Sequence, residues 1–347
     1  MDFKLYGNNE APTLLLIPGL GVSYEIFLPL IKLLEEKYRI IAVQVDGFTM
    51  GVNTRFTSVD DQAGQIIGYV QQHDGGRLDC AYGLSLGGKI LSRILERNEI
   101  IISHAIMDAA PLLPLPKWLV NPLRYYQSYN VWTCYHWTGF WKRVFHSHYF
   151  DVLLDECRKV FPFGGRQAVL DGYKDVYTNK LESISGPDIQ FWHGTKEAFV
   201  AKPQVKHLLS ICPEARITVF PGMNHGQLLV DRPEEIAGRI IETHHRRSIM
   251  DLSLQKWEYA SKDKLIALCN AVDRTFLSDR MPYPYTEADA DGWLGMVADH
   301  DGKEGVWRAI VADGQIVGSI SVEKMANENR AVGSIGYMIL TPFWNQG

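Results

Sequence analysis

The sequence predicts an α/β protein in which helices cover both faces of a mostly parallel sheet, followed by a smaller α+β unit. Three observations lead to this fold class. Short apolar runs alternate with amphipathic helical patterns along residues 1–247, as in a sheet built from strand–helix units. Each run is apolar throughout, as in strands buried on both faces. Beyond residue 247, two helical patterns precede strands that alternate in polarity.

The elements of the first part follow from local patterns. Residues 13–17 form an apolar run that stops at the glycine-rich loop Pro18-Gly19-Leu20-Gly21, and an amphipathic helix is expected after it. Further strands are expected at residues 38–45, 78–82, 100–107, 188–194 and 216–220, with helices beginning near residues 58, 89, 203 and 231. This alternation places the carboxyl ends of the strands at one edge of the sheet, where ligands bind in open parallel sheets.

A serine stands between the strand at 78–82 and the helical pattern after it, in the motif Tyr82-Gly83-Leu84-Ser85-Leu86-Gly87-Gly88. A sharp strand-to-helix turn of this kind lifts the serine clear of the sheet, and the glycines relieve the crowding of that turn. Ser85 is therefore the candidate nucleophile. In isolation the motif fits a turn of small residues without a catalytic role equally well. The residues predicted to lie near Ser85 must therefore distinguish the two interpretations.

Two further loops follow strands at the same predicted edge. They carry Glu197, after the strand at 188–194, and His225, after the strand at 216–220. A serine nucleophile needs an imidazole to take its proton and a carboxylate to orient that imidazole. The developing oxyanion needs donors, and the backbone N–H groups of Leu20 and Leu86 are placed to supply them. Alone, His225 would be structural and Glu197 a solvated acid; together, in this order, they predict a catalytic triad.

Residues 112–182 interrupt the alternation and are rich in aromatic side chains. A functional interpretation is a helical cap that folds over Ser85 and lines an apolar pocket; the alternative is a small helical insertion with an aromatic core. We expect a mixture, with most rings packed inside the insertion and a few facing an apolar or aromatic acyl substrate. His146 and His148 lack supporting carboxylate or cysteine ligands, so we expect a surface pair rather than a metal site.

These motifs resemble the α/β-hydrolase superfamily over residues 1–247. The resemblance rests on its oxyanion loop (residues 17–21), nucleophile elbow (83–87), acid loop (193–197) and histidine loop (222–226). It implies an eight-stranded, mostly parallel sheet with a helical lid, and ester or thioester hydrolysis without a metal or cofactor. Two positions depart from the family pattern: Glu197 stands where aspartate is commoner, and Pro18 where histidine is common. Asp108, at the end of the fourth strand, is the alternative acid.

The last part of the chain is expected to be a separate unit, residues 254–347, after a linker at 248–253. Two helices, a hairpin about Asp313-Gly314 and a strand at 331–340 resemble the first half of a GNAT-type N-acetyltransferase. In that family a glycine-rich turn holding acyl-CoA comes next, and Gly347 would be its first glycine. The resemblance therefore implies a truncated domain, and only a complete domain would bind acetyl-CoA. The alternative is an internal module that mediates pairing and has lost its own chemistry.

Composition narrows the class of protein. A net charge of −5 argues against a nucleic-acid partner. No apolar run reaches the roughly 18 residues of a membrane span, and the N-terminus lacks a secretory pattern. The five cysteines are scattered, which favours reduced thiols in a cytoplasmic protein. Because no long apolar run is present, we expect no membrane partner. We expect a serine hydrolase that acts on a small-molecule acyl substrate. One alternative is that the chain is part of a bifunctional hydrolase and acetyltransferase. Another is a non-catalytic binding module.

Overall fold

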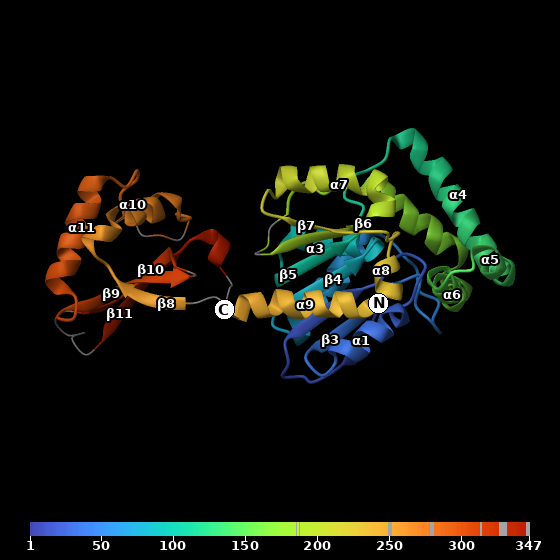
Figure 1. Cartoon of the computed structure of the whole chain (residues 1–347), viewed down its shortest axis with the longest axis horizontal. Coiled ribbons are helices and arrows are strands. Elements are labelled where there is room, and N and C mark those ends of the chain that lie inside the picture. The colour runs from blue at the N-terminus through green and yellow to red at the C-terminus, as the bar shows by residue number, and fades with distance from the viewer. Residues whose placement is uncertain are drawn as a thin grey trace. The chain divides into compact units, whose positions relative to one another are not determined.

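The computed structural model describes residues 1–184, 186, 188–248, 252–275, 277, 281–312, 314–325 and 332–344. The chain divides into two compact units, Met1–His244 and His245–Gly347 (Figure 1). The predicted hairpin residue Asp313, the middle of the predicted linker at 249–251 and Gly347 lie outside the described residues.

A seven-stranded sheet forms the centre of the first unit, in the order β1-β3-β2-β4-β5-β6-β7. β1 pairs antiparallel with β3, and the other neighbours pair in parallel. The predicted mostly parallel sheet is confirmed, but the described residues form one strand fewer than the eight implied by the family resemblance. The strands are β1 Asp2–Tyr6, β2 Thr13–Ile17, β3 Arg39–Gln44, β4 Arg77–Leu84, β5 Ile101–Asp108, β6 Ile189–Gly194 and β7 Arg216–Phe220.

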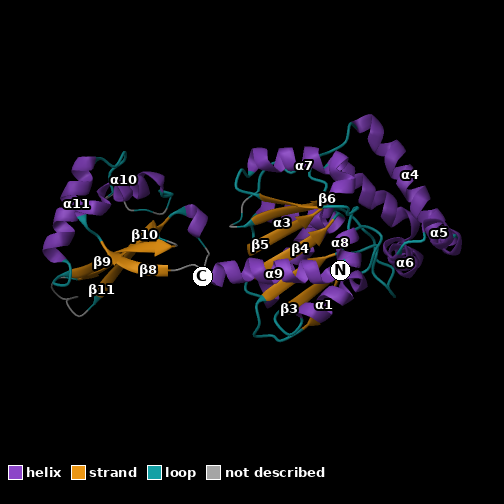
Figure 2. Cartoon of the chain, in the orientation of Figure 1, coloured by secondary structure: helices purple, strands orange, loops and turns teal. Residues whose placement is uncertain are grey.

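Helices cover both faces of this sheet, which explains why its strands are apolar throughout (Figure 2). Leu15 packs in one hydrophobic cluster with side chains of α2 and α3, whereas its neighbour Leu14 packs in a second cluster with side chains of α1 and α9. Successive residues of a strand point to opposite faces, so each face needs its own apolar set. The helices outside the cap are α1 Leu28–Leu34, α2 Val59–His73, α3 Leu86–Arg97, α7 Ala198–Ile211, α8 Gln227–Asp231 and α9 Pro233–Ser248.

The insertion between β5 and β6 is a helical cap of α4 Lys117–His136, α5 Thr138–Phe145 and α6 His148–Thr178. α6 bends at Gly165, whose φ is 61°, a conformation that glycine adopts readily. The buried carboxylate of Glu156 ties α6 to the body, because it accepts hydrogen bonds from Ser23 Oγ at 2.6 Å and Ser23 N at 3.0 Å. α4 and α5 pack on α6.

The expectation that most cap rings are packed inside the insertion holds for the rings on α6 but not for most of those on α4 and α5. Seven of the aromatic side chains on α4, α5 and the turn between them are exposed, which leaves only part of the aromatic set to form a core. They are Trp118, Tyr125, Tyr126, Tyr129, Trp137, Phe140 and Phe145.

The second unit is a four-stranded antiparallel sheet in the order β11-β10-β9-β8, with two helices against it. Trp257, Leu265 and Leu294 contribute to its core. The predicted helix cap at Thr286 is present, with its hydroxyl accepting from the amide of Asp289. The elements are β8 Leu252–Lys256, α10 Lys262–Ala271, α11 Glu287–His300, β9 Gly305–Ala312, β10 Gln315–Lys324 and β11 Gly333–Ile339. The expected linker at 248–253 therefore overlaps α9 and β8.

Candidate active site

Ser85 occupies the turn between β4 and α3 with φ 54° and ψ −111°. A positive φ is unfavourable for a residue with a Cβ, and such strain persists only where the surroundings impose it. Here the Ser85 amide donates to the carbonyl oxygen of Asp108 on the neighbouring strand at 2.8 Å. The strained turn presents the serine at the carboxyl end of the central strand, the geometry of a nucleophile elbow.

The glycines of the motif allow this turn to be tight. A Cβ at Gly83 would lie 2.5 Å from the carbonyl oxygen of Gly87, and a Cβ at Gly87 would lie 2.0 Å from the carbonyl oxygen of Ile17. Neither contact is tolerable, because both involve backbone atoms that cannot swing away. The pattern Gly-x-Ser-x-Gly is therefore a steric requirement of this strand–turn–helix junction.

The loop after β2 lies against the elbow, where the sequence predicts oxyanion donors. A Cβ at Gly19 would lie 3.6 Å from the Cβ of Ser85 and 3.6 Å from the carbonyl oxygen of Leu84. Leu86 is the first residue of α3, and the first N–H groups of a helix have no acceptor within it. The predicted donors Leu20 and Leu86 thus belong to two segments that meet at Ser85.

Glu197 and His225 are in direct contact. The Nδ1 atom of His225 is 2.7 Å from Oε2 of Glu197, and the other carboxylate oxygen accepts from the amide of Gly194 at 3.0 Å. Both oxygens of Glu197 are therefore engaged, which fixes the carboxylate and orients the imidazole. The side chain of Glu197 is 12% exposed and that of His225 is 51% exposed, so the acid is shielded while the ring is accessible.

Backbone contacts hold the acid and histidine loops together beside the elbow. The amide of Lys196 donates to the carbonyl oxygen of Met223 at 3.1 Å. The histidine loop also approaches the elbow, because a Cβ at Gly226 would lie 3.3 Å from the side chain of Leu84, which precedes Ser85. The extra methylene of a glutamate is accommodated because Glu197 lies in a short 3₁₀ turn, Thr195–Glu197, rather than directly at the strand end.

The two charges shift each other's pKa. Burial alone would raise the pKa of Glu197, but the hydrogen bond and charge of His225 outweigh it and lower that pKa. Desolvation of the covered part of the His225 side chain would by itself lower the pKa of His225, but the hydrogen bond to Glu197 and the charge of Glu197 outweigh it and raise that pKa. A carboxylate that stays ionised beside an imidazole of raised basicity is the pairing that general-base chemistry requires.

Asp108, the alternative acid, is engaged elsewhere. It is buried, and its Oδ2 accepts from the hydroxyl of Tyr82 at 2.5 Å. Burial raises the pKa of Asp108 to about 7, against the lowering effect of the Tyr82 hydrogen bond. The structure thus joins His225 to Glu197 and joins Asp108 to Tyr82.

The sequence does not single out Tyr149, which contacts the candidate site. Tyr149, at the start of α6, donates its hydroxyl to the backbone carbonyl oxygen of His225. This contact links the cap directly to the histidine loop. The sequence offered only the general aromatic richness of the insertion, which does not distinguish Tyr149 from its neighbours.

The described residues contain no group of three or more histidine, cysteine or acidic side chains that could hold a metal ion. Of the predicted surface pair, His146 is exposed at the end of α5 and His148 is exposed at the start of α6. Among all the described residues, no helix is long and apolar enough to cross a bilayer.

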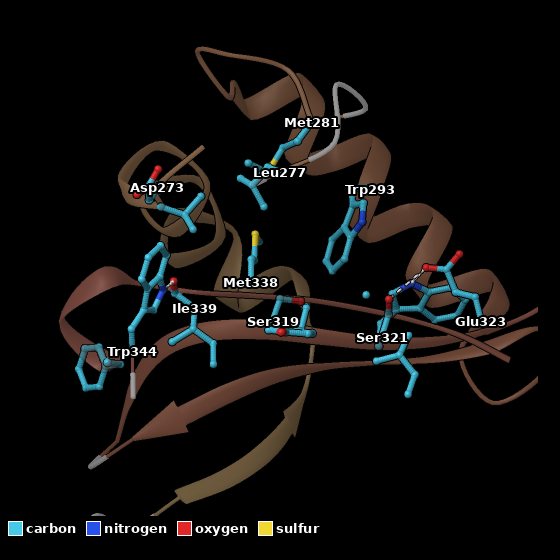
Figure 3. Close-up of a pocket in the computed structure, with 16 residues that line it drawn as sticks. Asp273, Leu277, Met281, Trp293, Ser319, Ser321, Glu323, Met338, Ile339 and Trp344 are labelled. Carbon is cyan, nitrogen blue, oxygen red and sulfur yellow. Dashed lines mark hydrogen bonds between the residues drawn. The ribbon is translucent and has the colours of Figure 1, made fainter. Parts of the chain in front are cut away.

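The second unit contains a cavity of about 880 Å³ between its helices and its sheet. Figure 3 shows Trp293 on the helical side of this cavity and Ser319, Ser321 and Met338 on the sheet side. At one end, Glu323 accepts from Nε1 of Trp307 at 3.2 Å and from Ser321 Oγ at 3.1 Å. The turn expected to hold acyl-CoA would begin at Gly347, which lies outside the described residues.

An open parallel sheet with a strained serine at the elbow after its central strand defines the class of α/β enzymes with a nucleophile at that turn. The model of the alpha/beta hydrolase family matches residues 14–239, which is most of the chain, and the protein belongs to this family. The model of the GNAT acetyltransferase domain matches residues 251–347. A search of curated proteins found no significant match.

Solved structures support the same fold for the first unit. A putative alpha/beta hydrolase family protein from Desulfitobacterium hafniense is 19% identical, with 70% of this chain and 99% of that chain covered and a TM-score of 0.59. An enol-lactonase from Burkholderia xenovorans is 17% identical, with 70% and 95% covered and a TM-score of 0.56. A thermophilic esterase from Thermogutta terrifontis is 16% identical, with 71% and 93% covered and a TM-score of 0.55. These identities establish the fold alone.

Proposed function

We propose that the first unit is a serine hydrolase that cleaves an ester or thioester through an acyl-enzyme. The observation that carries the proposal is the 2.7 Å contact between Nδ1 of His225 and Oε2 of Glu197, in loops beside the strained Ser85. This contact sets Nδ1 as the protonated nitrogen, so Nε2 is free to accept the proton of a serine hydroxyl.

In the proposed reaction, Ser85 Oγ attacks the acyl carbonyl carbon while His225 Nε2 takes the hydroxyl proton. The N–H groups of Leu20 and Leu86 stabilise the oxyanion. Collapse of the tetrahedral intermediate breaks the bond to the leaving alcohol or thiol, which receives the proton from His225. Water then attacks the acyl-enzyme with His225 as base, releasing the carboxylic acid and restoring Ser85.

A hydrolysis screen tests this proposal and narrows the substrate. The enzyme is assayed against p-nitrophenyl esters and acyl-CoA thioesters of graded chain length, with aromatic acyl groups included because the cap is aromatic-rich. Ser85→Ala serves as the control. Turnover that Ser85→Ala reduces at least about 1,000-fold supports the mechanism. Turnover that survives in Ser85→Ala contradicts it.

A second candidate function concerns the cavity of the second unit. We propose that it binds a small ligand with an apolar body and a primary amine, because aromatic rings line it and Glu323 stands at one end. A carboxylate that accepts hydrogen bonds is suited to an ammonium group. Phenethylamine is the probe, and isothermal titration of the full chain is the assay. Glu323→Gln is expected to weaken binding about tenfold; equal binding by both proteins contradicts the assignment.

A further inference from the structure

The cap presents an aromatic face to solvent, made of the exposed side chains of α4 and α5. On α4, ring-bearing residues recur at helical spacing along one side; they are Trp118, Tyr125, Tyr129, Trp132 and His136. Trp132 lies 6.4 Å from Trp137 between ring centroids, which joins this stripe to α5. We call the exposed side chains of these two helices and their connecting turn the cap face.

The cap face is turned away from the packing of the cap. On the other side of α4, Tyr135 stacks on Phe161 of α6 at 4.7 Å. In contrast, Trp118 is 75% exposed, Tyr126 60% and Phe140 57%. Large exposed aromatic side chains that cluster in this way mark interaction surfaces on soluble folds.

The charge of this region is opposite to that of the chain. Between Asp108 and Asp151 the sequence contains no acidic residue, whereas the whole chain has a net charge of −5. The same segment contains the four cations Lys117, Arg124, Lys142 and Arg143. Lys142 is paired with Asp155 of α6 at 2.7 Å, and the guanidinium of Arg124 lies 5.1 Å from the ring centroid of Tyr125. Arg124 is only partly exposed, so Lys117 and Arg143, which are both exposed, supply the positive charge of the cap face.

We propose that the cap face docks on an anionic lipid surface. Trp and Tyr have an apolar body and a polar tip, which suits them to the headgroup region of a bilayer. A Lys or Arg side chain near an anionic membrane is attracted by the negative surface potential of the headgroups. Many exposed rings, two exposed unpaired cations and no acidic residue on α4 or α5 are features of an interfacial surface.

Other occupants fit less well. A second copy of the chain would bring two positive faces together, which like charges oppose. Nucleic acid needs a dense row of cations along its phosphates, and the cap face has more exposed rings than unpaired cations. Docking on lipid is independent of the proposed hydrolase activity. Because vesicle binding is measured without an activity assay, the docking proposal and the hydrolase proposal can fail separately.

Flotation of the full chain with vesicles tests the proposal. The vesicles are phosphatidylcholine alone, or phosphatidylcholine with an equal part of phosphatidylglycerol, at 0.1 M and 0.5 M salt. The double variant Phe140→Ser with Arg143→Gln removes one exposed ring and one exposed cation from α5. Its matched control, Leu33→Ser with Lys32→Gln, makes the same kind of change on α1, where Leu33 is 46% exposed and Lys32 is exposed.

The proposal expects the wild type and the α1 control to float with the anionic vesicles. The α5 variant should partition at least about tenfold less, a loss of 1.4 kcal/mol. Binding should weaken at 0.5 M salt and on neutral vesicles. All four positions are exposed, so the variants are expected to fold, which circular dichroism checks. No flotation by the wild type, equal flotation by both double variants, or binding to a single-stranded oligonucleotide but not to vesicles would overturn the proposal.

Discussion

Replacing Glu197 by glutamine removes one charge with little change in shape. In the native site, Oε1 of Glu197 accepts from the Gly194 amide at 3.0 Å, and Oε2 faces Nδ1 of His225 at 2.7 Å. A glutamine can keep the Gly194 bond only with its carbonyl oxygen, so its NH₂ group must face His225. The imidazole must then accept at Nδ1 and carry its proton at Nε2, where it cannot receive the proton of Ser85.

The expected loss is large because the substitution selects the wrong tautomer. Comparable carboxylate-to-amide changes in serine triads lower kcat about 10⁴-fold, equivalent to about 5.5 kcal/mol of transition-state stabilisation. Glu197→Ala removes the carboxylate without imposing a tautomer, so the imidazole can still rotate into a useful state. We therefore expect Glu197→Ala to retain at least about tenfold more activity than Glu197→Gln.

The assay is kcat for the best ester found in the substrate screen, with thermal unfolding as the check on folding. Asp108→Asn is the control, because Asp108 contacts Tyr82 rather than His225. We expect Asp108→Asn to keep most of the activity. If Glu197→Gln stays within threefold of the wild type while Asp108→Asn loses activity a thousandfold, Asp108 is the catalytic acid and the reasoning is refuted.

Three further predictions concern His225, Gly87 and Glu156. Because the pKa of His225 is raised and its neutral form is the base, kcat/KM should rise with pH through an inflection above the 6.5 of a free imidazole; an inflection at or below 6.5 contradicts this. Gly87→Ala should lower the free energy of unfolding by about 1–3 kcal/mol in urea titration, since its Cβ would meet the Ile17 carbonyl; unchanged stability contradicts this. Glu156→Ala should cost about 1–3 kcal/mol and speed proteolysis of the cap, since both Ser23 donors lose their partner; Glu156→Gln, which keeps an acceptor, should cost less, and equal losses would contradict the anchoring role.

Much of the first unit could be predicted because its strands are buried on both faces. The run at β2 is apolar throughout because Leu14 and Leu15 each pack against helices, on opposite sides of the sheet. β1 was missed because it is an edge strand with partly exposed residues, so its pattern is weak. β8 is likewise not predicted, and its first two residues fall in the predicted linker at 248–253, because all five residues of this edge strand are exposed.

The sequence names the candidate residues Ser85, Glu197 and His225, but it does not give their contacts. Each of Ser85, Glu197 and His225 follows a strand at the same sheet edge, and that order is visible in the sequence. The choice between Glu197 and Asp108 depends on the 3₁₀ turn after β6 and on the Tyr82 hydroxyl, which no local pattern encodes. The Tyr149 contact joins segments separated by 76 residues, and the outward direction of the cap rings depends on how α4 packs on α6.

The most direct measurement is covalent labelling by a fluorophosphonate, followed by mass spectrometry of the intact protein and its peptides. Such a probe reacts with a serine only where a base and oxyanion donors activate it. The proposed mechanism predicts one adduct per chain, located on Ser85, and its loss in a folded Ser85→Ala variant. An adduct that persists in Ser85→Ala, or a folded wild type that the probe leaves unmodified, would contradict the assignment of Ser85 as the nucleophile.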